Sequence, residues 1–301
     1  MNRILQALTG ALLLALLTGG NCSRERVESI QHMNNGVNAF LERRFQVATE
    51  ELQRASVVDP TNDEAYFVLA NVYLELEQFE NAEESIEQAI RVNGEVAAYH
   101  EKLGTVRQFR EDYAGATEAL ERAIQLEPNL FKAYYKLGQV LEWQGRDPRQ
   151  SQDNVRSFNQ RALEKYTEAI ERGPRFMEAY IALGGLYYDL RFFDESVAVL
   201  RSGLEVALEG TEEEANLHHN LGTSLERQGN TEAAIEEFQA ALEITPSHSN
   251  ALFSIGWAYS LTGERDEARR YLNKFIRGAS NGGPAAYVQA ARDRLSEMQS
   301  D

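Results

Sequence analysis

The sequence is poor in cysteine and in basic side chains. Cys22 is the single cysteine among 301 residues, so neither an internal disulfide nor a cysteine-based zinc site is possible. Lysine and arginine together number 30 against 47 aspartates and glutamates, which gives a formal net charge of −17 at pH 7. Nucleic acid binding requires a basic surface that neutralises phosphates. The charge balance therefore argues against nucleic acid as the main partner.

The sequence also lacks the patterns that carry catalysis. It contains no glycine-rich phosphate loop and no serine or cysteine nucleophile motif. His218 and His219 are adjacent, so on a helix they point about 100° apart and do not form the paired face of an i, i+4 metal site. The acidic run 212–214 stands at an expected helix start, where the helix dipole favours negative charge. We therefore expect no enzyme, no cofactor, no metal and no small-molecule substrate.

What the sequence does contain is one pattern that returns every 34 residues. Pro60, Gly94 and Pro128 keep this spacing, and so do three alanines. The alanines are Ala55, Ala89 and Ala123. Self-similarity at this period is typical of stacked helix–turn–helix units.

The motifs identify the kind of repeat. One copy reads Tyr66-x-x-Leu69-Ala70-x-x-Tyr73 followed by Ala82-x-x-x-Ile86, and others carry the pairs Leu103-Gly104, Leu137-Gly138, Leu183-Gly184 and Leu221-Gly222. The chain resembles the tetratricopeptide repeat (TPR) family. This resemblance implies an all-α, right-handed superhelical solenoid that forms one domain over residues 29–301. About seven units are expected, at 29–62, 63–96, 97–130, 131–176, 177–210, 215–248 and 249–282.

Local signals predict where some helices begin and end. Thr61-x-x-Glu64 and Thr211-x-x-Glu214 are capping boxes, in which two side chains satisfy free amides at a helix start. Residues 285–298 follow a Gly-Gly-Pro break and form an expected capping helix. A solenoid needs such a helix to cover its open end. Its outer side should carry Arg292, Asp293, Arg294 and Glu297.

The fourth unit is longer than the others. Its second-helix residues Ala162, Tyr166 and Ala169 arrive 12 residues later than the 34-residue period requires. The extra stretch, 146–157, is polar and contains a proline. We interpret it as a lengthened loop, or as a loop with an extended second helix. It is either a tolerated insertion, because long loops cost little entropy, or a loop that contacts a partner.

The N-terminus has the features of an export signal. A single basic residue, Arg3, precedes an apolar run from Ile4 to Leu17, which has the length of a signal-peptide core and is short for a membrane span. The segment 1–21 resembles a bacterial lipoprotein signal peptide, which implies that Cys22 is acylated and that 22–28 form a polar tether. Asn21 and Gly19 depart from the small residue and the leucine usual at those positions. The alternatives are a secretory leader cleaved near Gly20 and an uncleaved anchor.

The resemblance implies that the first helix of each unit lines a concave groove. Helical spacing places eleven candidate peptide-binding residues there: Phe67, Asn71, Lys102, Lys132, Tyr135, Lys136, Gln139, Trp143, Tyr188, Asn220 and Trp257. Lysines beside aromatic side chains in an acidic protein suggest a site for an anionic, partly apolar peptide. In the alternative reading, the lysines are solvated and pair with Glu101, Glu142 and Glu178.

One subclass of the family clamps the terminal carboxylate of a peptide with lysines and asparagines of three successive units. Asn71 and Lys132 match that pattern, and Lys136 is basic where an arginine is usual. Lys102 replaces an asparagine and Phe67 replaces the first lysine. The resemblance to the clamp is therefore partial.

These features predict a non-enzymatic scaffold that binds a protein or peptide partner, in bacterial cell-envelope assembly. It would be an outer-membrane lipoprotein facing the periplasm, because Ser23 rather than an acidic residue follows the cysteine; otherwise it would be periplasmic or secreted. Two alternatives remain open. The protein is an accessory or regulatory subunit of an envelope enzyme complex, or a self-associating architectural protein.

Overall fold

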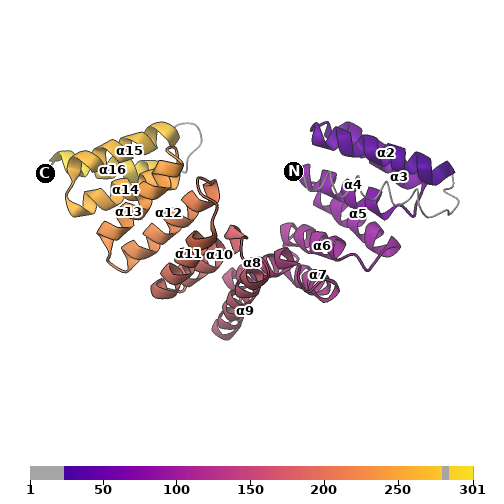
Figure 1. The fold of residues 1–301 in the computed structure, drawn as a ribbon, viewed down its shortest axis with the longest axis horizontal. Helices are drawn as coiled ribbons and strands as arrows, with labels where there is room; N and C mark the ends of the chain where they lie inside the picture. Colours follow the sequence, from indigo (N-terminus) through magenta and orange to yellow (C-terminus); the bar gives the residue numbers. More distant parts are fainter. Residues whose placement is uncertain (1–23, 280–284, 301) are drawn as a thin grey trace. The chain divides into compact units, whose positions relative to one another are not determined.

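The computed structural model describes residues 24–279 and 285–300, and within these ranges every regular element is an α-helix (Figure 1). The helices are α2 (Arg24–Leu41), α3 (Phe45–Val58), α4 (Asp63–Glu75), α5 (Phe79–Val92), α6 (Ala97–Phe109), α7 (Tyr113–Leu126), α8 (Phe131–Arg146), α9 (Gln152–Arg172), α10 (Met177–Asp189), α11 (Phe193–Val206), α12 (Glu212–Arg227), α13 (Thr231–Ile244), α14 (Ser249–Thr262), α15 (Arg265–Ala279) and α16 (Ala285–Ser300). The prediction of an all-α repeat fold is confirmed.

The helices form antiparallel pairs, and the pairs belong to two compact units. The N-terminal unit ends at Leu126 and holds the pairs α2–α3, α4–α5 and α6–α7; the C-terminal unit begins at Glu127 and holds α8 to α16. The boundary lies between α7 and α8, near the end of the expected third repeat (97–130), inside the stretch that the sequence predicts to be one solenoid. Each unit buries its own core, with Leu52 in the first and Leu217 and Leu272 in the second completely inaccessible to solvent.

Within each pair the two helices cross at a glycine or alanine of the first helix. A Cβ atom built on Gly184 would lie 2.7 Å from Cγ of Leu200, which is fully buried and has no room to move. The partner residue comes 16 positions later in five pairs: Gly36 with Leu52, Gly104 with Leu120, Gly184 with Leu200, Gly222 with Phe238 and Gly256 with Leu272. The repeated Leu-Gly motif is thus a contact between backbone and large side chain, as the sequence predicts.

The turn inside most pairs is tight and left-handed. Arg43, Glu77, Glu111 and Arg191 have φ between 56° and 65°, and Gly229 and Gly263 take the equivalent place in the last two pairs. The residue after each of them donates its amide to a carbonyl five positions earlier, as from Gln78 N to Tyr73 O at 2.8 Å. This bond closes the helix end in the manner of a Schellman motif. Only two of the six positions carry the glycine that makes such a turn visible in a sequence.

The insertion in the fourth unit is mostly helix. Only residues 147–151 separate α8 from α9, and α9 has 21 residues where α7 has 14. Ser151 caps α9 by accepting a hydrogen bond from the amide of Asn154 at 3.2 Å. The prediction of a loop over all of 146–157 is therefore wrong, and the second reading, a lengthened loop with an extended second helix, is confirmed. After Pro148 no helix-breaking residue occurs before Gly173, so the helix continues.

Other boundaries differ from the expectation by a few residues. α4 is capped by Asn62 Oδ1, which accepts from Ala65 N at 3.2 Å, because Thr61 instead donates to Asp59. The Thr211 box is confirmed: its hydroxyl accepts from Glu214 N at 3.3 Å. Residues 24–28, expected in a tether, form the start of α2.

The C-terminal helix α16 packs on α14 and α15. Arg292, Asp293 and Glu297 are exposed as expected. Arg294 is not on the outer side: its Nε donates to Ser260 Oγ at 2.8 Å and its Nη2 donates to Ser260 O at 3.0 Å. The helix is therefore held by a guanidinium that bonds to the end of α14.

Two neighbouring glycines of α10 test the helix-crossing contact. A Cβ on Gly184 collides with buried Leu200, whereas one on Gly185 meets nothing within 4 Å. We expect Gly184→Ala to destabilise the protein by about 2 kcal/mol through overpacking. Gly185→Ala should stabilise it by about 0.5–1 kcal/mol, because alanine favours the helix. Thermal unfolding followed by circular dichroism measures both; equal midpoints for the two variants would show that the contact does not limit packing.

Candidate functional site

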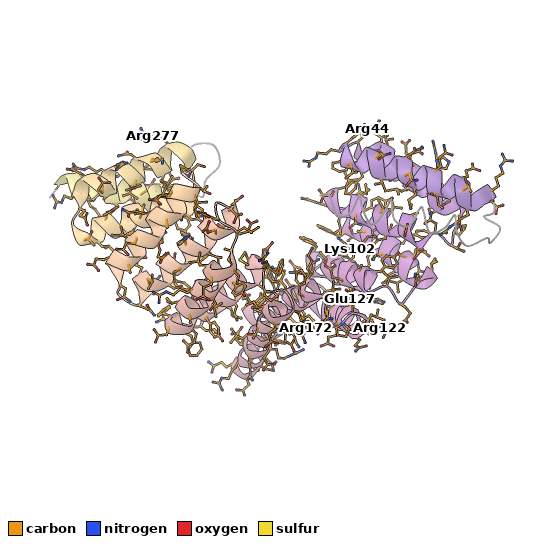
Figure 2. The ribbon with its side chains drawn as sticks, viewed as in Figure 1. Arg44, Lys102, Arg122, Glu127, Arg172 and Arg277 are labelled. Atoms are coloured by element: carbon orange, nitrogen blue, oxygen red, sulfur yellow. The ribbon has the colours of Figure 1, made fainter. Side chains whose placement is uncertain are left out.

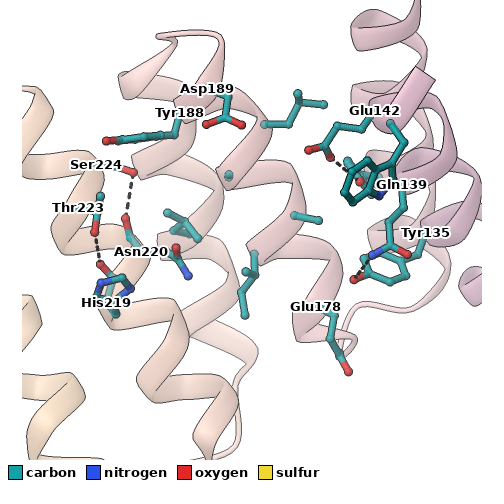
Figure 3. Close-up of a pocket in the computed structure, with 18 of the residues that line it drawn as sticks. Tyr135, Gln139, Glu142, Glu178, Tyr188, Asp189, His219, Asn220, Thr223 and Ser224 are labelled. Atoms are coloured by element: carbon teal, nitrogen blue, oxygen red, sulfur yellow. Dashed lines mark hydrogen bonds between the residues drawn. The ribbon is translucent and has the colours of Figure 1, made fainter. Parts of the chain in front are cut away.

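The C-terminal unit contains a cavity of about 550 Å³ (Figure 3). Side chains of α8, α10 and α12, the first helices of three successive pairs, form most of its lining, and Tyr166 of α9 and Leu200 of α11 complete it. In Figure 3, Tyr135 and Gln139 lie on one side of the cavity and His219 and Asn220 on the other. We call this site the α8–α12 cavity.

The cavity exists because α10, the central helix, carries small residues. Aligning the Leu-Gly pairs of the three helices places Ala182 and Gly185 of α10 in register with Lys136 and Gln139 of α8. Asn220 and Thr223 occupy the same two positions on α12. Replacing long side chains by a methyl group and a hydrogen leaves a hollow over α10, between the longer side chains of its neighbours.

The α8 wall is aromatic and hydrogen-bonded. Gln139 Nε2 donates to the Tyr135 hydroxyl at 3.0 Å, and the Tyr166 hydroxyl donates to Glu142 Oε2 at 2.8 Å. Burial, with a further contribution from Glu142, raises the pKa of Tyr166 far above its usual value, so its hydroxyl remains a donor. Trp143 at the rim is 49% exposed. This wall offers a fixed apolar surface with an accessible indole.

One arginine links α8 to α10 at the rim. Nη2 of Arg146 lies 2.5 Å from Glu142 Oε1 and 3.2 Å from Asp189 Oδ2. The same guanidinium lies 5.6 Å from the centroid of the Trp143 ring, within the range of a cation–π contact. Side chains of two helices thus hold this edge of the cavity in place.

The α12 wall is polar but electrically neutral. Its side chains bond within the unit: Asn220 Nδ2 donates to Asn216 O at 2.8 Å, and Ser224 shares a 2.8 Å hydrogen bond with Ser196. Burial and, to a smaller extent, the neighbouring His248, whose ring centroid is 5.3 Å away, lower the pKa of His219 to about 4. His219 is therefore uncharged at neutral pH.

The structure brings together five of the eleven predicted groove residues. Tyr135, Gln139, Trp143, Tyr188 and Asn220 all line the α8–α12 cavity. Their grouping follows from the first-helix positions that the sequence indicates.

The other predicted residues lie elsewhere. Lys132 and Lys136 are on α8 but do not line the cavity. Trp257 of α14 stacks on Phe253, with centroids 5.7 Å apart, and lies 5.8 Å from the guanidinium of Arg294. It is thus a neighbour of the C-terminal helix.

The remaining three predicted residues belong to the N-terminal unit. The ring centroids of Phe67 and Tyr99 lie 5.0 Å apart, Asn71 Nδ2 donates to Phe67 O at 2.9 Å, and Lys102 lies on α6 (Figure 2). The residues of the partial carboxylate clamp are therefore divided between the two units. Cys22, the predicted acylation site, lies outside the described residues.

The acidic character of the cavity is not predicted by the pattern of groove residues. Glu142, Glu178 and Asp189 line it, and Arg146 is the single arginine or lysine among its lining residues. Glu142 and Glu178 were considered only as partners for the groove lysines. The signal for this acidity is in the alignment of the Leu-Gly pairs of α8 and α10. It places Glu178 of α10 at the position that Lys132 occupies on α8.

The successive helix pairs, with a cavity along the first helices of three of them, define an α-helical repeat protein. Three sequence models support this: one described as Tetratricopeptide repeat matches residues 175–247 and 213–280, one described as TPR repeat matches 110–145, and a second Tetratricopeptide repeat model matches 63–95. The chain belongs to the tetratricopeptide repeat family.

Solved structures agree on the fold. The chain is similar to MamA, with 26% identity and a TM-score of 0.51 over 60% of this chain and 91% of that one. It is similar to Pseudomonas aeruginosa PilF, with 15% identity and a TM-score of 0.58 over 76% of this chain and 97% of that one. It is also similar to PilW, described as a widely conserved type IV pilus biogenesis factor, with 17% identity and a TM-score of 0.60 over 74% of this chain and 96% of that one. Curated protein sequences gave no match.

The described residues also bear on membrane contact. None of the helices within 24–279 and 285–300 is long and apolar enough to cross a membrane.

The partly buried His219 of the cavity makes stability depend on pH. In the folded protein the pKa of His219 is about 4, below the value of about 6.5 expected after unfolding. The stability due to neutral His219 is complete above about pH 6.5 and is lost as the pH falls towards 4. Between about pH 7.5 and about pH 5 the loss should be on the order of 2 kcal/mol.

Urea unfolding of the wild type and of His219→Gln at both pH values measures this loss. The difference in unfolding free energy between the two proteins at the higher pH reports the loss of packing. The change in that difference at the lower pH reports the protonation of His219. We expect the stability advantage of the wild type over His219→Gln to shrink or reverse at the lower pH. A gap that stays constant would contradict a depressed pKa for His219.

Proposed function

We propose that the protein is a non-enzymatic scaffold of envelope assembly that holds an extended or helical segment of a partner protein in the α8–α12 cavity. One observation carries the proposal: a single cavity spans the first helices of three successive repeats. Such continuity suits a linear segment, which contacts several repeats in turn.

The chemistry of the lining supports a peptide ligand. Tyr135, Trp143 and Tyr188 offer ring surfaces, and tyrosine and tryptophan are enriched at the centres of protein interfaces. Gln139 and Asn220 add amide groups near the apolar surface. The walls are held by hydrogen bonds between side chains of the unit itself, so little ordering is required when a ligand binds.

The envelope location is supported by two independent features. The segment 1–21 has the organisation of an export signal and is followed by Cys22. PilW, which shares the fold, is described as a pilus biogenesis factor. We propose that Cys22 is acylated and that the repeats act next to a membrane, because several acyl chains anchor a protein firmly.

Filling the cavity should abolish partner capture. Gly185 lines the cavity and has free space at its Cβ position, so Gly185→Phe places a ring in the hollow. Gly278 on α15 also has free space and lies outside the cavity, and Gly278→Phe is the matched control. In crosslinking pull-downs from membranes, we expect wild type and control to capture the same partner and Gly185→Phe to lose it. Loss with both variants, or with neither, would argue against the cavity as the binding site.

The same experiment tests the predicted basic groove. Lys132→Glu/Lys136→Glu reverses two charges of α8 that do not line the cavity. If this variant alone loses the partner, the site lies at the lysines rather than in the cavity. Co-purification of an enzymatic activity with the partner would instead identify an accessory subunit.

Intact-mass measurement of the membrane-extracted protein tests the anchor. We expect the wild type to carry acyl mass and to begin at Cys22, and Cys22→Ser to lose both the acyl mass and membrane retention. A Cys22→Ser protein that still carries acyl mass would rule out lipidation at this residue. The variant leaves the described helices unchanged, so partner capture in solution should persist.

A further inference from the structure

The charges of the α8–α12 cavity indicate the nature of its ligand. Three carboxylates line it, those of Glu142, Glu178 and Asp189, against the single guanidinium of Arg146. His219, the remaining ionisable base, is neutral at physiological pH. The cavity therefore has a formal charge of −2, which opposes an anionic ligand and favours a cationic one.

Arg146 shows how this lining accommodates a cation. Its guanidinium contacts Glu142 and Asp189 and lies against the indole of Trp143. Two of the three carboxylates thus already contact a positive group, although one guanidinium balances only one of their two charges. The aromatic rings and acids of the cavity are arranged so that one positive group contacts both kinds of side chain.

Glu178 is the carboxylate that remains. It is exposed at the first turn of α10, and no residue within 24–279 or 285–300 forms a hydrogen bond or ion pair with it. Its negative charge reaches Tyr135. Burial raises the pKa of the Tyr135 hydroxyl, and the charges of Glu178 and Glu142 also raise it. A cation placed between Glu178 and the Tyr135 ring would meet a carboxylate and a π-face together.

The surroundings of Glu178 are apolar enough to hold a side chain. Tyr135 packs edge-on against Phe176, with centroids 5.0 Å apart, and Ile181 continues the lining one turn further along α10. A ligand side chain lying on this surface would exclude water from it, which strengthens an ion pair with Glu178 relative to one in open water. Neighbouring apolar residues of a ligand would rest on the same surface.

We infer that the segment bound in the α8–α12 cavity carries an arginine or lysine flanked by apolar residues, and that its positive group pairs with Glu178 beside Tyr135. The inference rests on the proposed function, since it assigns the chemistry of the ligand to the same cavity. It differs from the anionic peptide that the groove lysines suggest, because those lysines lie outside the cavity.

A carboxylate in the first turn of a helix is also stabilised by the helix dipole, whether or not it binds a ligand. Glu213 is the matched comparison, because it is an exposed glutamate in the first turn of α12 and lies outside the cavity. Glu178→Gln and Glu213→Gln should change the stability of their helices to a similar extent. Only the first should change the binding of a cationic peptide.

The experiment begins with a selection of short random peptides displayed on phage, against the full-length protein in detergent. Sequences that also bind Gly185→Phe are removed, so those that remain require the cavity. The selected peptide and a version with its basic residue replaced by glutamine are then titrated against wild type, Glu178→Gln and Glu213→Gln. The chain has two tryptophans, so a Trp257→Phe background makes Trp143 fluorescence the reporter of occupancy.

We expect the retained peptides to be rich in arginine or lysine next to apolar residues. Glu178→Gln should weaken binding by about tenfold, and Glu213→Gln should not weaken it. Loss of the peptide's positive charge should cost a similar factor in the wild type and almost none in Glu178→Gln, as expected for two groups that contact each other.

Retained peptides that are acidic or uncharged would overturn the inference while leaving the cavity as a binding site. So would cationic peptides that bind Glu178→Gln as well as the wild type. If no peptide survives removal on Gly185→Phe, the proposed function itself fails. The failures of the two proposals are therefore distinguishable.

Discussion

The close contact between the two helices of each pair is the constraint on which the rest of the structure depends. A glycine or alanine on the first helix lets a large buried side chain of the second approach its backbone, as at Gly222 and Phe238. This contact fixes which side of the first helix is turned inward. The opposite side of that helix is then available for a site, and in α8, α10 and α12 it forms the cavity.

Much of the fold was predictable because its determinants are local and periodic. The 34-residue spacing and the Leu-Gly pairs give the helix pairs and the crossing points, and Thr211 marks a helix start correctly. The Asn62 cap was missed because Thr61 forms its hydrogen bonds with Asp59 instead. The left-handed turn residues were missed because four of the six are arginine or glutamate, which give no signal of a positive φ.

The position of the candidate site was predictable in part, and its charge was not. Helical spacing correctly indicates that Tyr135, Trp143 and Tyr188 point to one side of their helices, and the structure gathers them in one cavity. The sign of the cavity's charge depends on which side chains of different helices come together, as Glu142 and Asp189 do at Arg146. Residues 43 positions apart in the chain carry no local signal of that meeting.

The insertion in the fourth repeat changes the edge of the cavity without changing the contact at which the two helices cross. Gly138 still receives a large side chain, that of Tyr166, although their separation is 28 residues instead of 16. Most of the 12 added residues extend the two helices away from the crossing point, and the added end of α8 carries Arg146. Repeat number and repeat register are therefore preserved while α8 gains about one turn of helix and α9 about two, relative to α6 and α7. A single length change in one module can add a functional group to a binding surface without altering the architecture that presents it.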